Sequence, residues 1–156
     1  MSKFNFKLQS VLDLKIQMED NKKNEFGSAV KKLENEKKLL ENIKLEKEEN
    51  INAFSNELKN KAKVWTLRQI NGYISLLEQK IEVQKENVNK ASVIVDKKRE
   101  ELLEAVKERK IMDKLRDKEY DLFLKEQLKE EQKIIDEIIS FKHSTNLAGD
   151  ENENAK

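Results

Sequence analysis

Residues that could carry out acid–base, nucleophilic or metal chemistry are scarce in this sequence. It contains a single histidine, His143, and no cysteine. A cysteine nucleophile, a disulfide and a thiolate metal site are therefore excluded. His143 falls at the expected C-terminal end of a long helix, where an imidazolium would favourably oppose the helix dipole, so we interpret it as a capping residue. The three glycines lie too far apart to form a phosphate-binding loop.

Carboxylates are abundant, since 31 of the 156 residues are Asp or Glu. A carboxylate becomes a useful acid or base near neutral pH where a cleft excludes water and shifts its pKa. The patterns described below predict an elongated helical protein, which offers no such cleft. We therefore expect a protein without enzymatic activity, bound metal or cofactor.

The composition restricts both fold and partners. Charged residues make up 40% of the chain and aromatic residues 6%, and there is no proline, so the chain can fill a narrow seam but not a broad core. The net charge of +1 disfavours non-specific binding to nucleic acid. Lys63, Trp65 and Arg68 could stack on a base, but helix capping explains Trp65 better.

No apolar run is long enough to span a bilayer, so we expect a soluble cytoplasmic protein.

The elements that position these residues follow from a repeating pattern between Thr66 and about Lys142. Apolar residues recur there alternately four and three positions apart, which is typical of a helix that faces a partner helix along one stripe. At 1.5 Å per residue this helix would be on the order of 110 Å long. Two polar residues interrupt the stripe, which consists of Ile70, Ile74, Leu77, Ile81, Gln84, Val88, Ala91, Val95, Lys98, Leu102 and Ala105.

A second stripe with the same spacing precedes the first. Its predicted members are Phe26, Val30, Leu33, Lys37, Leu40, Lys44, Lys47, Ile51, Phe54 and Leu58. Three lysines thus stand where apolar residues are wanted, and their aliphatic stems tolerate this at some cost in stability. We expect an all-α fold in which the two helices form a long antiparallel coiled-coil hairpin.

The turn of this hairpin is predicted at about residues 60–66. Thr66, followed three residues later by Gln69, has the form of a capping box, and Trp65 and Ile70 are spaced as a hydrophobic staple. Residues 1–143 then form one hairpin domain, with helix one over about 5–60 and helix two over about 67–142. Gly72 becomes a weak point within the first turns of helix two.

The end of the hairpin opposite the turn, here called the open end, combines aromatic and basic residues. Helix two outlasts helix one, so a single-helix overhang follows about Lys125, and its exposed apolar residues predict a binding surface or self-association. The apolar N-terminal residues could lie on a membrane, but we favour burial against protein. Residues 107–118 are locally basic and could face an acidic partner or be an ordinary mixed-charge surface. The polar tail at 144–156 is expected to be disordered.

Three groups of residues resemble a known family. They are Phe4-x-Phe6-x-Leu8-Gln9-x-Val11-Leu12-x-x-Lys15, then Glu108-Arg109-Lys110-x-x-x-Lys114-Leu115, then Glu131-Gln132-Lys133-x-x-Asp136-Glu137. Together with Tyr73-Ile74-x-x-Leu77-Glu78-x-x-Ile81 after the turn, their order and spacing are similar to those of the flagellar export protein FliJ.

This resemblance implies a non-enzymatic component of the flagellar type III export apparatus, shaped like the central γ-subunit stalk of rotary ATPases. The implied partners are the export ATPase hexamer, the cytoplasmic domain of the export gate and export chaperones. The implied location is the cytoplasm at the flagellar base, where protein partners hold the chain at the inner membrane. The ATPase-binding residues at the open end would be Phe4, Phe6, Leu8, Leu12, Arg109, Lys110, Leu115, Tyr120 and Phe123. The gate-binding residues at the turn end would be Tyr73, Leu77, Lys80 and Gln84.

Two other functions fit the same sequence. A stalk of a virulence-type III secretion system would share the fold and the mechanism, and partner identity would separate it from a flagellar stalk. A purely structural or scaffolding coiled coil would explain every periodicity without any ATPase. The open end discriminates between stalk and scaffold, because a scaffold should tolerate the loss of Phe4, Phe6 and the overhang.

Overall fold

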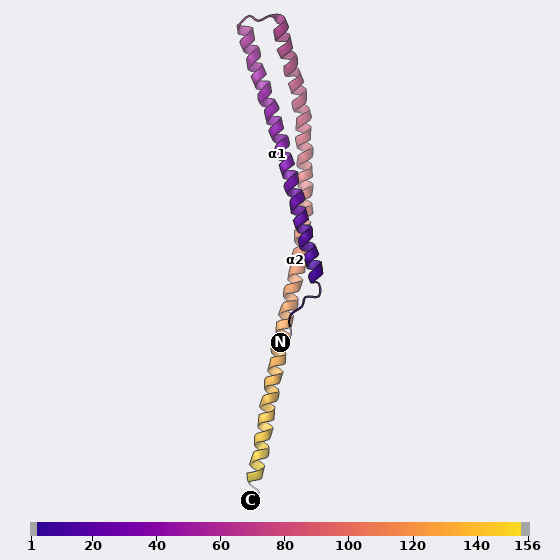
Figure 1. Cartoon of the computed structure of the whole chain (residues 1–156), viewed down its shortest axis with the longest axis vertical. Helices are drawn as coiled ribbons and strands as arrows, with labels where there is room; N and C mark the ends of the chain where they lie inside the picture. Colours follow the sequence, from indigo (N-terminus) through magenta and orange to yellow (C-terminus); the bar gives the residue numbers. More distant parts are fainter. Residues whose placement is uncertain (1–2, 154–156) are drawn as a thin grey trace. The chain divides into compact units, whose positions relative to one another are not determined.

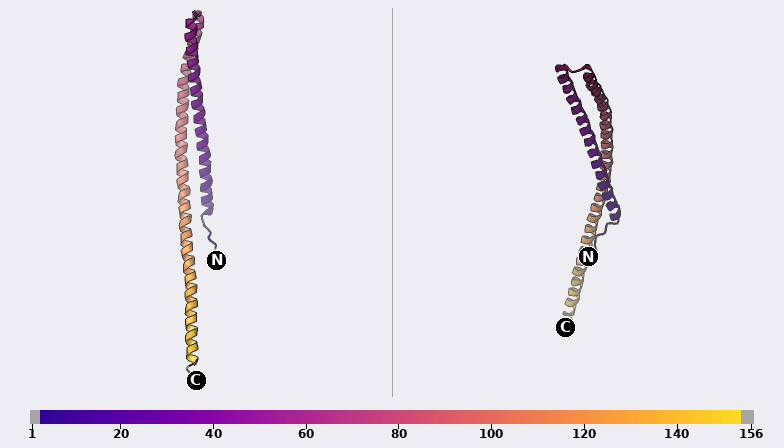
Figure 2. Two further views of the ribbon diagram at one scale, coloured as in Figure 1. Left: turned by 90° about the vertical axis from the view of Figure 1, so that its left-hand side faces the viewer. Right: turned by 45° about the horizontal axis from the view of Figure 1, so that its top comes forward.

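Two long α-helices account for nearly all of the chain. The computed structural model describes the backbone of residues 3–153 and the side chains of residues 3–143. Helix α1 spans Gln9–Lys59 and helix α2 spans Val64–Glu153, and the described residues contain no strand. Figure 1 shows that α1 reverses into α2 through a short connection, and Figure 2 shows the same reversal from two further directions. The predicted all-α coiled-coil hairpin is confirmed.

The contacts within the chain divide it into two compact units. One unit is Lys15–Glu108, which contains the turn and the paired lengths of α1 and α2. The other combines the N-terminal segment through Leu14 with Arg109 and the residues that follow it. The predicted turn-end surface lies entirely in the first unit, and the predicted open-end surface lies entirely in the second.

The predicted stripe of α2 forms the core of the unit Lys15–Glu108. Every one of its eleven members is buried or half-buried, from Ile70 to Ala105, and Leu77 has no exposed surface. The spacing of four and three keeps these side chains on one face of the helix, and burial of that face against α1 is the main stabilising contribution available to so polar a chain. This part of the sequence-based prediction is confirmed.

The predicted stripe of α1 is displaced by one residue at several positions. Lys37 and Lys44 are exposed, and the half-buried positions are Glu36 and Ile43 instead. Glu36 is held in the seam by Gln84, whose Nε2 donates to Glu36 Oε2 at 2.5 Å and to the Glu36 carbonyl oxygen at 3.0 Å. A hydrogen-bonded pair satisfies both polar side chains, whereas two lysines in the seam would have to bring their ammonium groups out to water.

The same displacement continues toward the turn. Asn50 and Glu57 are half-buried, whereas Ile51 and Leu58, which the pattern placed in the seam, are 43% and 57% exposed. Lys47 keeps its predicted place, because its ammonium reaches Glu78 of α2 at 2.9 Å. The half of α1 near the turn therefore presents apolar side chains to solvent.

A left-handed residue closes helix α1. Lys61 has φ 57°, the Ala62 amide donates to the Glu57 carbonyl at 3.0 Å and the Lys61 amide donates to the Leu58 carbonyl at 3.2 Å. These two bonds define a Schellman motif, here with lysine where glycine is the usual residue. The connection between the helices therefore covers residues 60–63.

Helix α2 begins three residues before the predicted start. The Leu67 amide already donates to the Lys63 carbonyl at 3.3 Å, so Lys63 is the N-cap and Thr66 lies inside the first turn. The predicted capping box at Thr66 is therefore wrong. Trp65 is 69% exposed and is not buried as a hydrophobic staple would be. The Schellman motif explains the difference, because it ends α1 at a position that lets the next helix start directly after Lys63.

Helix α2 also extends beyond its predicted end. The structure gives helix through Glu153, whereas the sequence predicted disorder from Ser144. No proline interrupts this stretch, and extending an existing helix costs far less than nucleating a new one. Residues 154–156 of the predicted tail lie outside the described residues.

Four charged side chains form a closed cluster across the two helices. Lys22 lies 3.2 Å from Glu25 and 2.9 Å from Glu101, and Lys98 lies 2.8 Å from Glu25 and 3.2 Å from Glu101. One heptad away, Lys15 contacts Glu108 at 2.6 Å, so the cross-helix pairs advance seven residues along α1 and retreat seven along α2. Because the paired residue numbers rise along α1 and fall along α2, the two helices run antiparallel in this unit.

The cluster shifts the titration of all four groups. Hydrogen bonds from Lys98 and then Lys22 lower the pKa of Glu25, and bonds from Lys22 and then Lys98 lower the pKa of Glu101. The same bonds raise the pKa of Lys22 and of Lys98. The carboxylates therefore stabilise the hairpin above their unfolded pKa near 4.5, and that stabilisation disappears as the pH falls through their lower folded pKa. The ammonium groups lose theirs as the pH rises above 10.5 and through their raised folded pKa.

The first prediction concerns Gly72. A Cβ built at this position meets nothing within 4 Å. Replacing Gly72 by Ala should therefore raise the free energy of unfolding by about 1 kcal/mol, because glycine is the poorer helix former. Urea unfolding followed by circular dichroism measures this. Gly27, which also has open space around its Cβ, is the matched control and should respond alike. A lower free energy of unfolding for Gly72→Ala would contradict a continuous helix there.

The second prediction concerns acid stability. The double substitution Glu25→Gln and Glu101→Gln removes the carboxylates whose pKa values are lowered. The melting temperature of the variant should fall less than that of the unchanged chain between about pH 6 and about pH 3. Glu34→Gln with Glu48→Gln, two exposed carboxylates of α1, is the control and should retain the full dependence. Equal pH dependence in all three proteins would show that the cluster contributes nothing.

Candidate partner-binding surfaces

Neither a candidate metal site nor a membrane-spanning helix is found among the described residues. Within residues 3–143 no three His, Asp or Glu side chains are arranged to hold a metal ion. His143 is exposed on α2. In the described part of the chain, neither helix has a segment long and apolar enough to cross a membrane.

An aromatic cluster lies at the predicted open end. The ring of Phe4 meets Tyr120 edge-on, with centroids 5.1 Å apart and planes at 76°, and meets Phe123 at 5.5 Å and 54°. Edge-on and tilted contacts at these distances are the favourable geometries for aromatic rings. The cluster fixes a non-helical N-terminal segment against α2, so α1 begins at Gln9 and not near residue 5 as predicted.

The predicted apolar residues of this end fall into two groups. Phe6 is 4% exposed and Leu12 has no exposed surface, so both hold the N-terminal segment in place. Leu8, Leu115 and Tyr120 are 38%, 37% and 45% exposed and can contact a partner. Phe6 and Leu12 therefore stabilise the open end, whereas Leu8, Leu115 and Tyr120 are available for contact with a partner.

The predicted basic residues also differ in availability. Lys110 is exposed. Arg109 is half-buried, and its guanidinium lies 2.5 Å from Asp113 one turn later on the same helix. Because Asp113 partly neutralises its charge, Arg109 attracts a distant anion less strongly than an arginine without such a neighbour would.

A shallow cleft beside the aromatic cluster was missed by the sequence analysis. Its volume is about 410 Å³, and it is lined by Phe4, Asn5, Phe6, Gln9, Arg116, Asp117 and Tyr120. Arg116 and Asp117 form an ion pair at 3.6 Å. The spacing of α2 could have revealed Arg116 of this cleft. The half-buried positions of α2 continue after Ala105 at steps of four and three, and they include Arg109, Met112, Arg116, Glu119 and Phe123. Most of these residues are polar, so hydrophobicity alone does not reveal them.

The C-terminal overhang is apolar on its surface. Six large apolar side chains between 128 and 141 are at least half exposed: Leu128, Ile134, Ile135, Ile138, Ile139 and Phe141. A groove of about 520 Å³ lies among Ile134, Glu137, Ile138, Phe141 and Lys142. Exposed apolar side chains of this kind on a highly charged helix make the stretch a candidate contact surface.

The predicted turn-end surface is only partly available. Leu77 has no exposed surface and Gln84 is 5% exposed, because both point into the seam with α1. Lys80 is exposed, and Tyr73 is 37% exposed. The Tyr73 hydroxyl donates a hydrogen bond to Glu46, whose nearby carboxylate raises the pKa of the phenol.

Apolar side chains that the sequence analysis did not select stand beside Tyr73 and Lys80. Leu76 is 45% exposed and Val83 is 61% exposed. These four residues follow one another at steps of three and four, so they share one outward face of α2. Leu77 and Gln84 lie one residue away from this face, in the stripe that the spacing itself predicted to be covered by the partner helix. Their assignment to a partner contact came from the family resemblance and not from the spacing.

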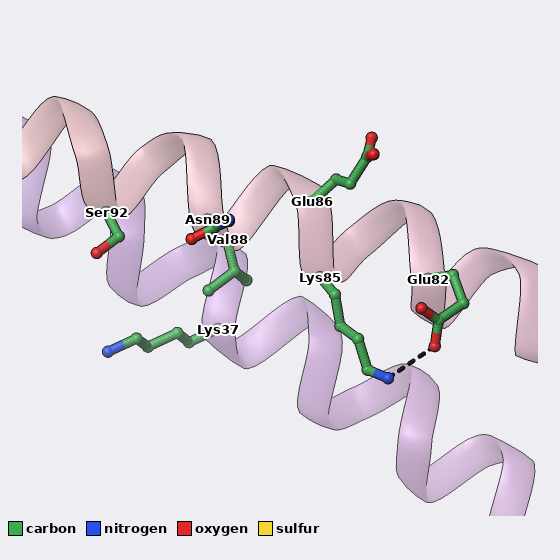
Figure 3. A pocket seen from close by; sticks show the side chains of 7 residues that line it. All are labelled: Lys37, Glu82, Lys85, Glu86, Val88, Asn89 and Ser92. Atoms are coloured by element: carbon green, nitrogen blue, oxygen red, sulfur yellow. Dashed lines mark hydrogen bonds and ion pairs between the residues drawn. The ribbon is translucent and has the colours of Figure 1, made fainter.

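A shallow groove between the helices has no clear ligand chemistry. Its volume is about 450 Å³, and its lining alternates Lys37 and Lys85 with Glu82 and Glu86 around Val88. Figure 3 shows Lys85 reaching along its own helix to Glu82, at 2.7 Å, while Glu86 points away from the groove. Opposite charges thus compensate each other locally, and no set of like charges converges.

The chain was compared with known proteins. Residues 4–148 match the family model described as flagellar FliJ protein. Among solved structures, a YscO homologue from Chlamydia trachomatis, CT670, is similar with a TM-score of 0.67 and 22% sequence identity, over 92% of this chain and 98% of that one. No curated protein matches the sequence significantly. The structural likeness supports the hairpin fold.

Proposed function

Because the chain belongs to the family of flagellar FliJ proteins, we propose that it is a non-enzymatic stalk of the flagellar type III protein export apparatus. In this role the open end binds the ring of the export ATPase hexamer and promotes its assembly and activity. The hairpin then links the ring to the cytoplasmic domain of the export gate, and export chaperones bind along it. The match over residues 4–148 carries the proposal, since it covers the hairpin and most of the overhang.

The surface of the open end supports an ATPase contact there. The aromatic cluster around Phe4 holds two chain segments together, while Leu8, Leu115 and Tyr120 stay partly exposed beside it. An interface needs such anchored aromatic and apolar side chains at its centre and a polar rim around them. Lys110 supplies a positive charge at the rim.

For the gate contact we propose the outward face of α2 near the turn. Tyr73 and Lys80 remain from the sequence-based assignment, and the exposed Leu76 and Val83 extend it. Leu77 and Gln84 contribute indirectly, because their burial against α1 fixes the rotation of α2 and so determines which face is presented.

A stalk of a virulence-type III secretion system is the second candidate. The observation that favours it is the similarity of fold to the YscO homologue of Chlamydia trachomatis. Binding measured in parallel to the ATPase of a flagellar system and to that of a virulence system from the same cell would separate the two. The flagellar proposal requires the tighter complex with the flagellar enzyme.

The third prediction tests the open-end surface. Substituting Tyr120 and Phe123 by Ala removes both ring contacts of Phe4. Helicity should be largely retained, since both residues lie in a long helix and Ala favours helix, but binding to the ATPase should weaken by roughly tenfold or more. Leu103→Ala, at an exposed position of α2 outside the cluster, is the control. Unchanged binding of the double variant would remove this surface from the proposal.

The fourth prediction tests the stalk function as a whole. The export ATPase should hydrolyse ATP faster in the presence of the purified chain, and sedimentation should show a heavier ATPase assembly. A stalk requires both effects, because ring assembly and activation are coupled. If a folded hairpin produces neither effect, the chain is a scaffolding coiled coil.

A further inference from the structure

The turn of the hairpin has a charge distribution unlike the rest of the chain. Lysine and arginine nearly balance aspartate and glutamate overall, 32 against 31. Between Glu57 and Glu78, however, no acidic residue occurs, and four basic ones do: Lys59, Lys61, Lys63 and Arg68. All charged side chains within residues 58–77 are therefore positive.

All four basic side chains are directed to solvent. Each is exposed, and none forms an ion pair with another residue in the described part of the chain. Some lysines of the same unit differ, since Lys22, Lys47 and Lys98 are each paired with a carboxylate of the opposite helix. The positive charge at the turn is thus uncompensated within residues 3–143.

Large apolar side chains alternate with these charges. Leu58, Val64 and Trp65 are 57%, 64% and 69% exposed, which places them among the most exposed apolar residues of the described chain. Trp65 is the only tryptophan. We call the set Leu58, Lys59, Lys61, Lys63, Val64, Trp65 and Arg68 the basic turn.

The backbone holds the basic turn as a convex projection. The Schellman motif at Lys61 ends α1, and α2 begins at Val64, so the four basic and three apolar residues occupy the last turn of one helix, the link and the first turns of the next. The first turn of α2 carries no acidic residue to offset its positive helix end. A tip of this form can enter the surface of a lipid bilayer.

We propose that the basic turn docks on the surface of an anionic phospholipid bilayer. The lysines and the arginine contact lipid phosphates, and Leu58, Val64 and Trp65 enter the headgroup region. Tryptophan is the side chain most typical of this interface, and clustered basic residues are drawn to anionic leaflets. This inference goes beyond the proposed stalk function, in which protein partners alone hold the chain near the membrane.

The observations favour lipid over other anionic partners. Sequence-independent nucleic-acid binding needs a long basic face, whereas the basic residues of this acid-free stretch span only 59–68 and the chain as a whole is nearly neutral. An acidic protein groove would be expected to meet a helical face with repeated apolar spacing, whereas Leu58, Val64 and Trp65 surround a reversal of the chain. Four charges and three apolar side chains predict weak, reversible and salt-sensitive binding.

Trp65 provides a direct test, because its fluorescence is the only tryptophan signal of the chain. The full-length protein is mixed with phosphatidylcholine vesicles, with and without about one quarter phosphatidylglycerol. With anionic vesicles the emission should shift to shorter wavelength and become less accessible to a soluble quencher, and added salt should reverse both changes. Neutral vesicles should produce much smaller changes. An oligonucleotide of matched charge is measured alongside.

Variants locate the contact within the chain. Lys61→Gln with Lys63→Gln should lower the partition coefficient for anionic vesicles by roughly tenfold or more. Lys31→Gln with Lys32→Gln removes the same charge from exposed positions of α1 and should have little effect. Trp65→Ala should reduce co-sedimentation with vesicles, whereas Leu39→Ala, at an exposed apolar position on α1, should not. Circular dichroism checks that each variant stays helical.

Three results would overturn the proposal. The first is no change in Trp65 emission with anionic vesicles. The second is vesicle binding to which both double lysine variants respond equally, which would assign it to overall charge. The third is a stronger response to the oligonucleotide than to anionic vesicles. None of these measurements includes the ATPase, so the outcome is independent of the proposed stalk function.

Discussion

The structure depends on the burial of one narrow stripe of α2 against α1. In the unit Lys15–Glu108 the buried apolar residues, Leu77, Ile81, Ala91 and Val95, all belong to this stripe, and a chain with 40% charged residues has little else with which to form a core. Because the stripe is only one residue wide at each step, its rotation and register must be set by other contacts. Polar side chains do this: Gln84 with Glu36 in the seam, and the cluster of Lys22, Glu25, Lys98 and Glu101 beside it.

Much of this arrangement could be predicted from the sequence, because a period of four and three survives occasional polar residues. The stripe of α2 was found entire for that reason. In α1 two stripes one residue apart are almost equally apolar, and the choice between Lys37 and Glu36 depends on a hydrogen bond from the opposite helix. A pattern within one helix cannot contain that information. The turn was placed correctly at residues 60–66, but the start of α2 was not, since Thr66 has the form of a cap whereas Lys61 ends α1 by backbone bonds alone and α2 begins directly after Lys63.

The candidate surfaces also contain parts that could be predicted from the sequence and parts that could not. The aromatic cluster at the open end was predictable, because Phe4, Tyr120 and Phe123 are rare residue types in this chain. The cleft beside it was not, since Arg116 and Asp117 look like ordinary surface residues. At the turn end, Leu77 and Gln84 lie in the seam, as the stripe predicted, so the side chains available to a partner are the adjacent Leu76 and Val83. The rotation of α2 about its own axis therefore determines which side chains are exposed at each end of the hairpin.

The connection at 60–63 has a consequence for how two copies could meet. The cross-helix contacts of the seam and of the charged cluster do not depend on whether α1 and α2 come from one chain. If the short link straightened, α1 of one molecule could pair with α2 of another through the same residues, as in domain swapping. Two backbone hydrogen bonds, donated by Lys61 and Ala62, hold the connection in its closed form. In such an exchange only residues 60–63 would need to change conformation, since the contacts of the seam would form again between the two molecules.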